Sequence, residues 1–337
     1  MGQVELAPSG IQPEDLISWL PVDASIHNGK PAVEWMRLPG VEFTEPFFGQ
    51  TIERVNAECG SQRLVSEFDL LLRAEKVFDS IDPSGFIFHS SRCGSTLLAN
   101  ACRAVQGSIV ISEAPVLDKI ISRFFTDAET ETKLLLYKLV LRATVRALGQ
   151  RRLGNERHLF IKFACTSTLH MRHIRSIWPN VPFVFLYRDP VEIIVSNLKT
   201  IPEWMCFESN PATAAAIAGV DEFQLKGMSA EEFCARSLGR YFVEAADNTD
   251  LSTLAINYSR LNFATVISAL EFLGVVASAH ELHAIPTISG LYSKDSTQRQ
   301  AFKSDSESKK ISASAYAREM AQKWAHQRFE ALQRRSS

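Results

Sequence analysis

Between residues 81 and 275, short apolar runs alternate with stretches in which apolar residues recur at helical spacing. The runs predict buried strands, at Phe86-Ile87-Phe88, Ile109-Val110-Ile111, His158–Phe163, Phe183–Tyr187 and Thr253–Tyr258. The stretches between them predict helices, at Leu97–Val105, Thr130–Leu148, Leu169–Trp178, from Pro190 onward, at Ala230–Ala246 and at Leu261–Leu273. Strands that alternate with helices favour an α/β fold, with a mostly parallel sheet covered by helices on both faces.

The flanking sequence is less regular. Residues 1–80 predict helices at Gln50–Cys59 and Leu64–Phe78 and carry no chemical signal. Residues 201–227 are variable in pattern, and residues 289–310 are polar and basic without periodicity. A last helix is predicted at Ile311–Arg335. We therefore expect one α/β domain at residues 81–337, preceded by an N-terminal extension at residues 1–80.

Composition and charge fit this picture. The chain has 337 residues, of which 46% are hydrophobic and 22% charged, as in ordinary globular enzymes. A formal net charge of -2 argues against general binding to nucleic acid or to a membrane surface. The charge is uneven, however, because residues 1–60 hold 3 Lys/Arg against 9 Asp/Glu, whereas residues 151–200 hold 8 against 3. An anion site is therefore expected in the middle of the chain.

The cysteines and the first residues bear on metal binding and location. No metal-ligand spacing connects the six cysteines, which are Cys59, Cys93, Cys102, Cys165, Cys206 and Cys234. The stretch Met1–Gln12 lacks the basic and apolar parts of a secretory signal, and no run is apolar enough for a membrane span. These features predict a cytoplasmic protein with reduced thiols and no metal.

The loop that follows the first strand, His89–Thr96, has the composition of an anion site. It lies just before a predicted helix, whose first N–H groups and dipole favour a phosphate. Gly94 allows close approach of the backbone, Ser95 and Thr96 add hydroxyl groups, and Arg92 adds a charged donor. The loop departs from the pattern GxxxxGK[ST], because no Lys follows Gly94. An ordinary capped helix is the alternative interpretation.

Two motifs carry a family resemblance. Arg92-Cys93-Gly94-Ser95-Thr96-Leu97-Leu98 resembles the loop that binds the 5′-phosphosulfate in the sulfotransferases that use PAPS (3′-phosphoadenosine 5′-phosphosulfate). Arg188-Asp189-Pro190, followed by Ser196, resembles the second half of that family's signature, in which an Arg and a Ser eight positions later bind the 3′-phosphate. Each motif stands at the C-terminal end of a predicted strand. The resemblance implies a P-loop-type three-layer fold.

Further matches point to the bacterial and tyrosylprotein-type branch of this family. Glu113 is similar to the Glu that acts there as the base, and Lys162 to a Lys that contacts the transferred sulfonate. The string Ile256–Leu261 resembles a mainly structural segment. The resemblance implies three catalytic residues, Arg92, Glu113 and Lys162. It implies that the nucleotide is bound by Arg92, Cys93, Gly94, Ser95, Thr96, Leu97, Arg188 and Ser196. Cys93 stands where Ser is usual, and Ser293, with Lys294 and Lys303, is expected to close over the nucleotide.

The resemblance implies sulfonate transfer from PAPS to a hydroxyl or amine of a small-molecule or peptide acceptor, with PAP as product and no metal. Residues 1–80 and 201–230 are expected on the acceptor side. One alternative is a P-loop kinase or nucleotide hydrolase that uses Mg-ATP with Asp189 as the acid, although Asp189 also suits a role in its own turn. Another is a non-catalytic nucleotide-binding protein on the same fold. Direct roles for His89 and for the Cys93 thiol stay open, and the sequence identifies neither the acceptor nor the oligomeric state.

Overall fold

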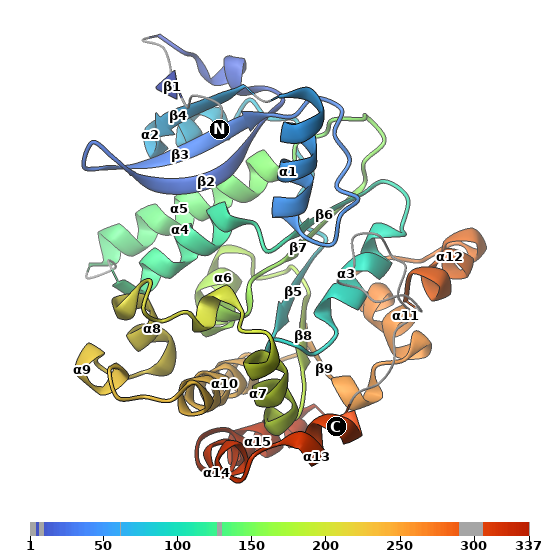
Figure 1. The fold of residues 1–337 in the computed structure, drawn as a ribbon. Coiled ribbons are helices and arrows are strands. Elements are labelled where there is room, and N and C mark those ends of the chain that lie inside the picture. The colour runs from blue at the N-terminus through green and yellow to red at the C-terminus, as the bar shows by residue number, and fades with distance from the viewer. Residues whose placement is uncertain (1–4, 7–9, 61, 127–129, 290–305, 337) are drawn as a thin grey trace.

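The computed structural model describes residues 5–6, 10–60, 62–126, 130–289 and 306–336. At its centre lies a five-stranded sheet in the order β6-β7-β5-β8-β9, in which every pairing is parallel (Figure 1). The strands are β5 (Gly85–His89), β6 (Ser108–Ser112), β7 (His158–Lys162), β8 (Phe183–Tyr187) and β9 (Thr253–Asn257). The parallel α/β architecture predicted from the alternating pattern is confirmed.

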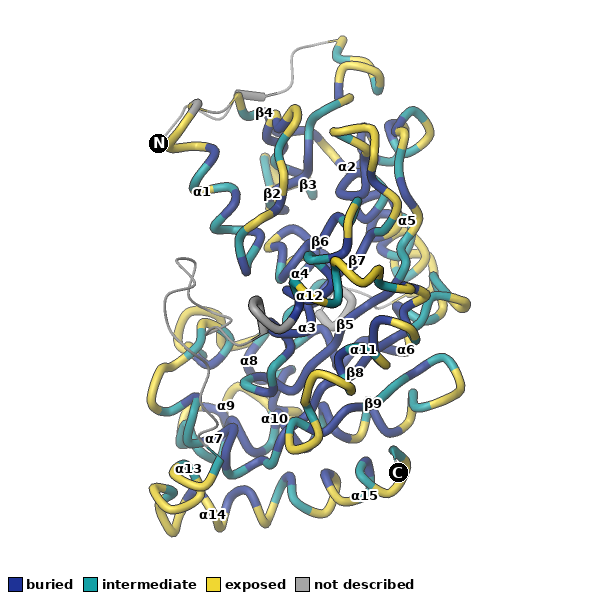
Figure 2. Tube along the Cα trace, turned by 90° about the vertical axis from the view of Figure 1, so that its right-hand side faces the viewer, coloured by how far each residue is buried: buried dark blue, intermediate teal, exposed yellow. Residues whose placement is uncertain are grey.

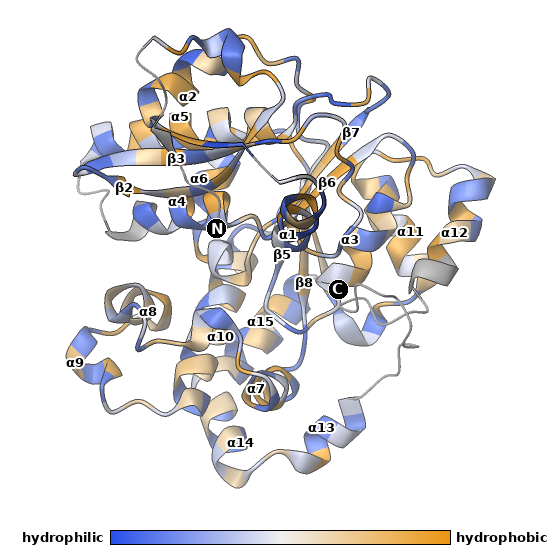
Figure 3. Ribbon diagram, turned by 45° about the horizontal axis from the view of Figure 1, so that its top comes forward, coloured by the Kyte–Doolittle hydropathy of each residue, from blue (hydrophilic) through white to orange (hydrophobic). Residues whose placement is uncertain are grey.

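Alternate residues of each central strand enter two different cores. In β5, Phe86 and Phe88 belong to the larger core, whereas Ile87 belongs to the smaller core on the opposite face. Both faces of the strands are therefore apolar, as the mostly orange β6 and β7 in Figure 3 and the dark-blue strands in Figure 2 show. The smaller core is completed by α3 (Ser95–Arg103), α11 (Phe263–Phe272) and α12 (Ala279–Ser289). The larger core is completed mainly by α4 (Pro115–Thr126), α5 (Glu131–Leu148), α6 (Met171–Ile177), α7 (Pro190–Lys199) and α10 (Ala230–Asp247).

The order of the strands places a topological switch point next to β5. The chain leaves β5 toward the β6 edge of the sheet, and it leaves β8 toward the opposite edge, at β9. The loops after β5 and β8 therefore diverge, and ligands of open α/β sheets bind where such loops separate. Both sequence motifs lie there, because the loop after β5 carries Arg92–Thr96 and the end of β8 leads into Arg188.

The N-terminal region forms a second sheet, in the order β1-β4-β3-β2. Its elements are β1 (Glu5–Leu6), a 3₁₀ turn (Pro13–Leu16), β2 (Trp19–His27), β3 (Lys30–Arg37), α1 (Phe48–Cys59), β4 (Arg63–Glu67) and α2 (Phe68–Ala74). The predicted helix at Gln50–Cys59 is confirmed. The predicted helix at Leu64–Phe78 is wrong in its first part, because residues 63–67 pair with β3 as an antiparallel strand and the helix is confined to α2.

This second sheet packs on the central domain. Strand β2 contacts α4 and α5, and α2 contacts α5. Figure 1 shows β2 and β3 lying across these two helices. Apolar residues of both regions, Trp35 of β3 and Val140 of α5 among them, belong to one continuous core. The residues of the N-terminal extension are therefore bound to the α/β domain by a shared apolar interior.

The C-terminal part departs from the prediction of one helix at Ile311–Arg335. The structure has α13 (Ser306–Ser312), then a break at which the Ser314 hydroxyl accepts the Ala317 N–H and caps a new helix. That helix comprises α14 (Ala315–Ala321), a π-helical turn (Gln322–His326) and α15 (Gln327–Arg335). The remaining elements are 3₁₀ turns at Cys165–His170, Glu203–Met205 and Tyr258–Arg260, with α8 (Pro211–Ala218) and α9 (Glu222–Leu225).

Candidate active site

The loop between β5 and α3 is built on left-handed backbone. Ser91, Arg92 and Gly94 have φ values of 69°, 50° and 84°. The positive φ favours glycine at position 94, and a Cβ there would also lie 2.4 Å from a methyl carbon of Leu261, whose side chain would have to move. Helix α3 begins at Ser95, and its first N–H groups have no partners within the helix. This turn is therefore well suited to binding a phosphate, because backbone donors and the positive end of the α3 dipole converge there.

The loop is fastened to β8 behind this turn. The Ser90 N–H and the Cys93 thiol both donate to the Leu186 carbonyl, at 3.0 and 3.1 Å. The Cys93 side chain is fully buried, and this burial raises the pKa of the thiol. Cys93 is thus a neutral thiol that anchors the loop, and any contact of this residue with a phosphate would use its backbone N–H. The Leu97 side chain likewise lies in the smaller core.

Lys162 and Glu113 meet in front of the loop. Lys162 is the last residue of β7, and its ammonium group donates to the Glu113 carboxylate and, at 3.3 Å, to the Thr96 hydroxyl. Glu113 directly follows β6 and has a φ of 53°, and its N–H donates to the Lys162 carbonyl at 2.7 Å. The paired backbones at the ends of β6 and β7 therefore fix the positions of Glu113 and Lys162 relative to each other.

His89 completes this group. Its Nδ1 accepts the Ser91 N–H at 3.1 Å, so a neutral His89 carries its proton on Nε2. That nitrogen lies 3.3 Å from a carboxylate oxygen of Glu113. The sequence left open whether His89 has a direct role. The structure places His89 against the same carboxylate as Lys162.

The electrostatics of the group centre on Glu113. Burial alone would raise the pKa of Glu113, but the charge of Lys162 and the hydrogen bond from His89 hold it well below its usual range. At neutral pH the carboxylate is therefore ionised. The Lys162 side chain is 1% exposed, whereas the Glu113 side chain is 30% exposed. Glu113 is thus the more accessible member of the pair.

Arg188 forms a second buried pair at the end of β8. Its Nε lies 2.6 Å from the Glu192 carboxylate, and its Nη1 donates to the Arg92 carbonyl at 3.2 Å. The guanidinium also lies over the Tyr258 ring, at 4.1 Å from the ring centroid. Burial would raise the pKa of Glu192, but the hydrogen bonds from Arg188 and Ser306 lower it. A charged arginine is therefore fixed beside the loop.

The Arg92 side chain points away from the Lys162–Glu113 pair. Its Nε donates to the Asn197 side-chain oxygen at 3.0 Å, and its Nη2 donates to the Thr200 carbonyl at 2.7 Å. Asn197 also accepts from the Ser91 hydroxyl, at 3.3 Å. The far end of α7, where Ser196 lies, is thus joined to the loop. Direct contact of the Arg92 guanidinium with a sulfonate stays a prediction, and it would require these two hydrogen bonds to open.

Asp189 has a structural task in this arrangement. One of its oxygens accepts the N–H groups of Val191 and Glu192, at 2.9 and 3.3 Å, and so caps α7. Lys310 of α13 lies 3.7 Å from the other oxygen and 3.3 Å from Glu192. These contacts favour the interpretation that Asp189 stabilises its own turn. Ser293, Lys294 and Lys303 lie outside the described residues.

Several residues of the site were not found from the sequence. Glu192 stands four positions after Arg188, a spacing that brings side chains together on a helix and that could have indicated the pair. Asn197 follows Ser196 directly but has no signal of its own. Ser306 and Lys310 reach Arg188 and Glu192 from a distant part of the chain. Only the folded chain brings these last contacts together.

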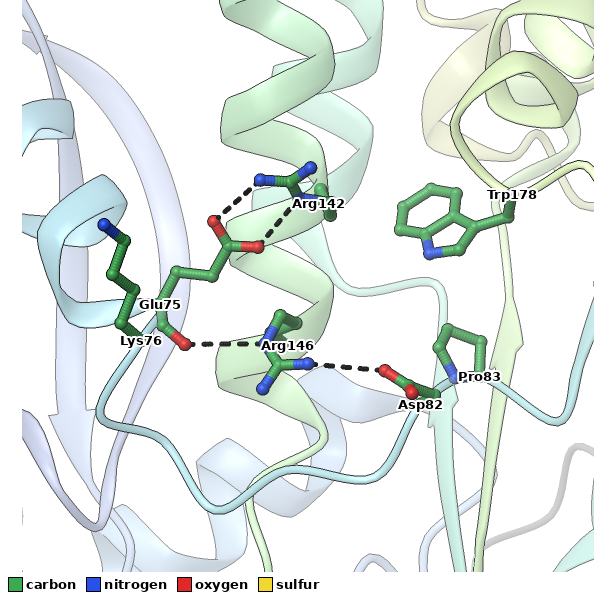
Figure 4. A pocket seen from close by; sticks show the side chains of 7 residues that line it. All are labelled: Glu75, Lys76, Asp82, Pro83, Arg142, Arg146 and Trp178. Carbon is green, nitrogen blue, oxygen red and sulfur yellow. Dashed lines mark hydrogen bonds and ion pairs between the residues drawn. The ribbon is translucent and has the colours of Figure 1, made fainter.

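A different cavity, of about 500 Å³, lies at the opposite end of the strands, next to the turn that precedes β5 (Figure 4). Its two arginines already have acidic partners, since Arg142 lies 2.8 Å from Glu75 and Arg146 lies 3.3 Å from Asp82. This cavity is therefore less suited to an anion than the loop after β5. Among the described residues, no His, Cys, Asp and Glu side chains gather in threes as a metal site would need, and no helix combines the length and apolar character of a membrane span.

Comparisons with known proteins give a likeness in structure alone. No family model matches the chain, and no curated protein matches it in sequence. Among solved structures, a sulfotransferase from Alicyclobacillus acidocaldarius has a TM-score of 0.39 and 12% identity, over 76% of this chain and 96% of that one. The sulfotransferase domain of the curacin biosynthetic pathway has a TM-score of 0.41 and 14% identity, over 72% and 98%. Mouse sulfotransferase SULT7A1, solved with PAP, has a TM-score of 0.36 and 14% identity, over 70% and 72%. At these values the likeness establishes no common family, substrate or mechanism.

Proposed function

We propose that the chain transfers a sulfonate group from PAPS to a hydroxyl or amine of a small-molecule or peptide acceptor. The observation that carries the proposal is the Lys162–Glu113 pair, which lies directly in front of the loop after β5 and touches it through Thr96. An ammonium donor and an ionised carboxylate are thereby placed side by side, next to a loop suited to a phosphate. In sulfonate transfer from a phosphosulfate, the carboxylate can act as the base and the ammonium group can stabilise the charge on the sulfonate.

In this mechanism the loop and the N-terminus of α3 bind the 5′-phosphate end of the donor through Gly94, Ser95 and Thr96. The oxygen or nitrogen of the acceptor bonds to sulfur, and Glu113 accepts the proton that this atom loses. The bond between sulfur and the bridging oxygen breaks, and PAP leaves with the negative charge on its 5′-phosphate. Lys162 stabilises the sulfonate oxygens and the leaving oxygen.

Arg188 and Ser196 are assigned to the 3′-phosphate. Arg188 is charged, fixed by Glu192 and joined to the loop through the Arg92 carbonyl, so a phosphate bound to it has a defined position relative to the loop. Arg92 is assigned to shaping the loop and to the sulfonate. Ser293, in the basic segment, is assigned to the nucleotide.

The test is a calorimetric titration with PAP in the absence of metal, run against ATP with Mg²⁺ on the same protein. Binding of PAP but not of Mg-ATP, followed by release of PAP from PAPS on turnover, is the expected result. Preference for Mg-ATP would overturn the proposal in favour of a kinase or nucleotide hydrolase. Binding of PAP without any turnover of PAPS, with or without acceptors, would favour a non-catalytic nucleotide-binding protein.

A further inference from the structure

The N-terminal region reaches into the candidate active site through one aromatic ring. The Lys162 ammonium lies 4.8 Å from the centroid of the Phe47 ring, within the range of a cation–π contact. Phe47 immediately precedes α1 and is half-buried. The ring is thus a further neighbour of the ammonium group, besides Thr96 and Glu113, and it belongs to the region outside the sequence resemblance.

The segment that carries Phe47 is held on its own side by α1. The Glu45 carboxylate accepts from the Thr51 hydroxyl at 2.6 Å and from Arg54 Nε at 2.5 Å. Burial would raise the pKa of Glu45, but these hydrogen bonds, that of Arg54 first, lower it to about 2. Phe43 stacks on Phe48, with the ring centroids 5.5 Å apart. The turn that presents Phe47 is thus fixed on both sides of the ring.

Two arginines of the α/β domain hold the same segment from the other side. Arg103, at the end of α3, donates from Nε to the Phe43 carbonyl at 2.8 Å. Arg152 donates from Nε to the Val41 carbonyl at 3.2 Å, and its guanidinium lies 4.7 Å from the centroid of the Phe43 ring. Helix α3 therefore connects the phosphate-type loop at its start with the Phe47 segment at its end, so the ring has a defined place relative to the site.

The unequal burial of Lys162 and Glu113 agrees with an aromatic ring that covers Lys162. Lys162 is almost fully buried although it carries a charge, whereas the neighbouring Glu113 is partly exposed. A lysine is costly to bury, and this one is compensated by a carboxylate, a hydroxyl and an aromatic face. Removal of the ring would leave space next to the ammonium that water can fill.

We propose that Phe47 is a water-excluding wall over Lys162, supplied by the N-terminal region, and that it directs the sulfonate to the acceptor rather than to water. The proposal rests on the proposed function. In the reaction that Phe47 suppresses, a water oxygen bonds to sulfur, the bond between sulfur and the bridging oxygen breaks, and Glu113 takes the proton. The products are sulfate and PAP. Phe47 touches Lys162 and is a specificity-determining residue in this scheme.

The first experiment needs no substrate. Acetic anhydride acylates accessible lysine amines, and mass spectrometry of the Lys162 peptide gives the rate of acylation. We expect faster acylation of Lys162 in Phe47→Ala and a wild-type rate in Phe47→Leu, which keeps an apolar side chain in place. Phe223→Ala is the matched control, because Phe223 is 84% exposed on α9. A wild-type rate in Phe47→Ala would overturn the proposal, and circular dichroism verifies that each variant is folded.

The second experiment measures PAP released from PAPS without an acceptor. We expect a several-fold faster release in Phe47→Ala and no change in Phe47→Leu or Phe223→Ala. Equal release in Phe47→Ala and wild type, with PAP binding intact, would overturn the proposal. Faster release in Phe47→Leu as well would also overturn it, since the aromatic charge contact would then matter rather than water exclusion. If wild-type protein binds no PAP, the proposed function fails and the sulfonate step fails with it, while the acylation rate still reports whether Phe47 covers Lys162.

Discussion

Two pairs of a cation and a carboxylate stand at the C-terminal ends of the strands on either side of β5, and they differ in access. In the first, Lys162 holds Glu113, whose side chain is 30% exposed and whose backbone has a φ of 53°. In the second, Arg188 holds Glu192, which is 5% exposed and lies within helix α7. The first carboxylate is open to an entering molecule, and the second is closed in by α13. Two pairs of the same chemical kind are thus suited to different tasks. The Lys162–Glu113 pair is suited to proton transfer, and the Arg188–Glu192 pair is suited to holding an arginine in a fixed orientation.

The largest expected difference between the pairs is in the chemical step. Glu113→Gln keeps the shape of the side chain but removes its ability to accept a proton. We expect the single-turnover rate with PAPS and acceptor to fall by about 100- to 10,000-fold, the usual contribution of a general base. PAP affinity should change little, because the loop and Arg188 are untouched.

The matched variant is Glu192→Gln, which makes the same isosteric change in the closed pair. Its single-turnover rate should stay within a few-fold of wild type, because Glu192 contacts Arg188, Ser306 and Lys310 and not the reacting groups. Equal losses in the two variants would break the comparison and would remove Glu113 from the role of base.

A smaller effect is expected on nucleotide binding. Arg188→Gln should weaken PAP binding by about 10- to 100-fold in calorimetry, the equivalent of one lost charge-assisted hydrogen bond. The variant leaves the buried Glu192 without Arg188, so the double variant Arg188→Gln/Glu192→Gln removes that charge as well. The double variant should lose the same affinity for PAP as Arg188→Gln and should have a higher free energy of unfolding than Arg188→Gln alone.

A similar arginine pair offers the control for this measurement. On α10, Arg236 lies 2.9 Å from Glu232 at the same i,i+4 spacing, with both side chains 22% exposed. Arg236→Gln also removes a guanidinium paired with a Glu at this spacing, in the opposite order along the chain and distant in sequence from both motifs. It should leave PAP affinity unchanged, and an Arg188 variant that also bound PAP normally would show that the 3′-phosphate site lies elsewhere.

The parts of the molecule that sequence predicted well are those with local causes. The strands and helices of the α/β domain follow from apolar runs and helical periodicity, and the loop after β5 follows from its glycine and hydroxyl residues. The N-terminal sheet has weaker local signals. The sequence of β4 predicts the first part of one long helix with α2. Its pairing with β3 makes it a strand instead.

The same contrast holds within the site. Arg188, Glu113 and Lys162 were predicted because each stands at the end of a strand and resembles part of a known motif. Phe47 and Lys310 were not, because each comes from a distant segment and is recognisable only by what it touches. The orientation of Arg92 toward Asn197 and Thr200 is also a product of tertiary contacts, and residue type and spacing did not indicate it.

The smallest expected effect is a difference between two pH profiles. Lys162 and His89 lower the pKa of Glu113, with Asp118 as a nearby acid whose own pKa is raised by burial and, to a lesser degree, by Glu113. Arg188 and Ser306 lower the pKa of Glu192. Both Glu113 and Glu192 therefore stabilise the folded protein above the ordinary range of a Glu, and that contribution is lost as pH falls through their lowered values. In thermal unfolding, the stability advantage of wild type over Glu113→Gln and over Glu192→Gln should shrink in the same direction on acidification.

Only Glu113 should appear in the rate. Its protonated form accepts no proton, so activity falls on the acid side. The profile of kcat/KM reports the free enzyme, in which Lys162 acts fully on Glu113, whereas the profile of kcat reports the complex, in which a bound sulfonate shares the charge of Lys162. The pKa of Glu113 should therefore rise on binding, and the acid limb of kcat should lie at higher pH than that of kcat/KM. Coincident limbs would mean that the sulfonate does not bind Lys162, and the open pair would then be as purely structural as the closed one.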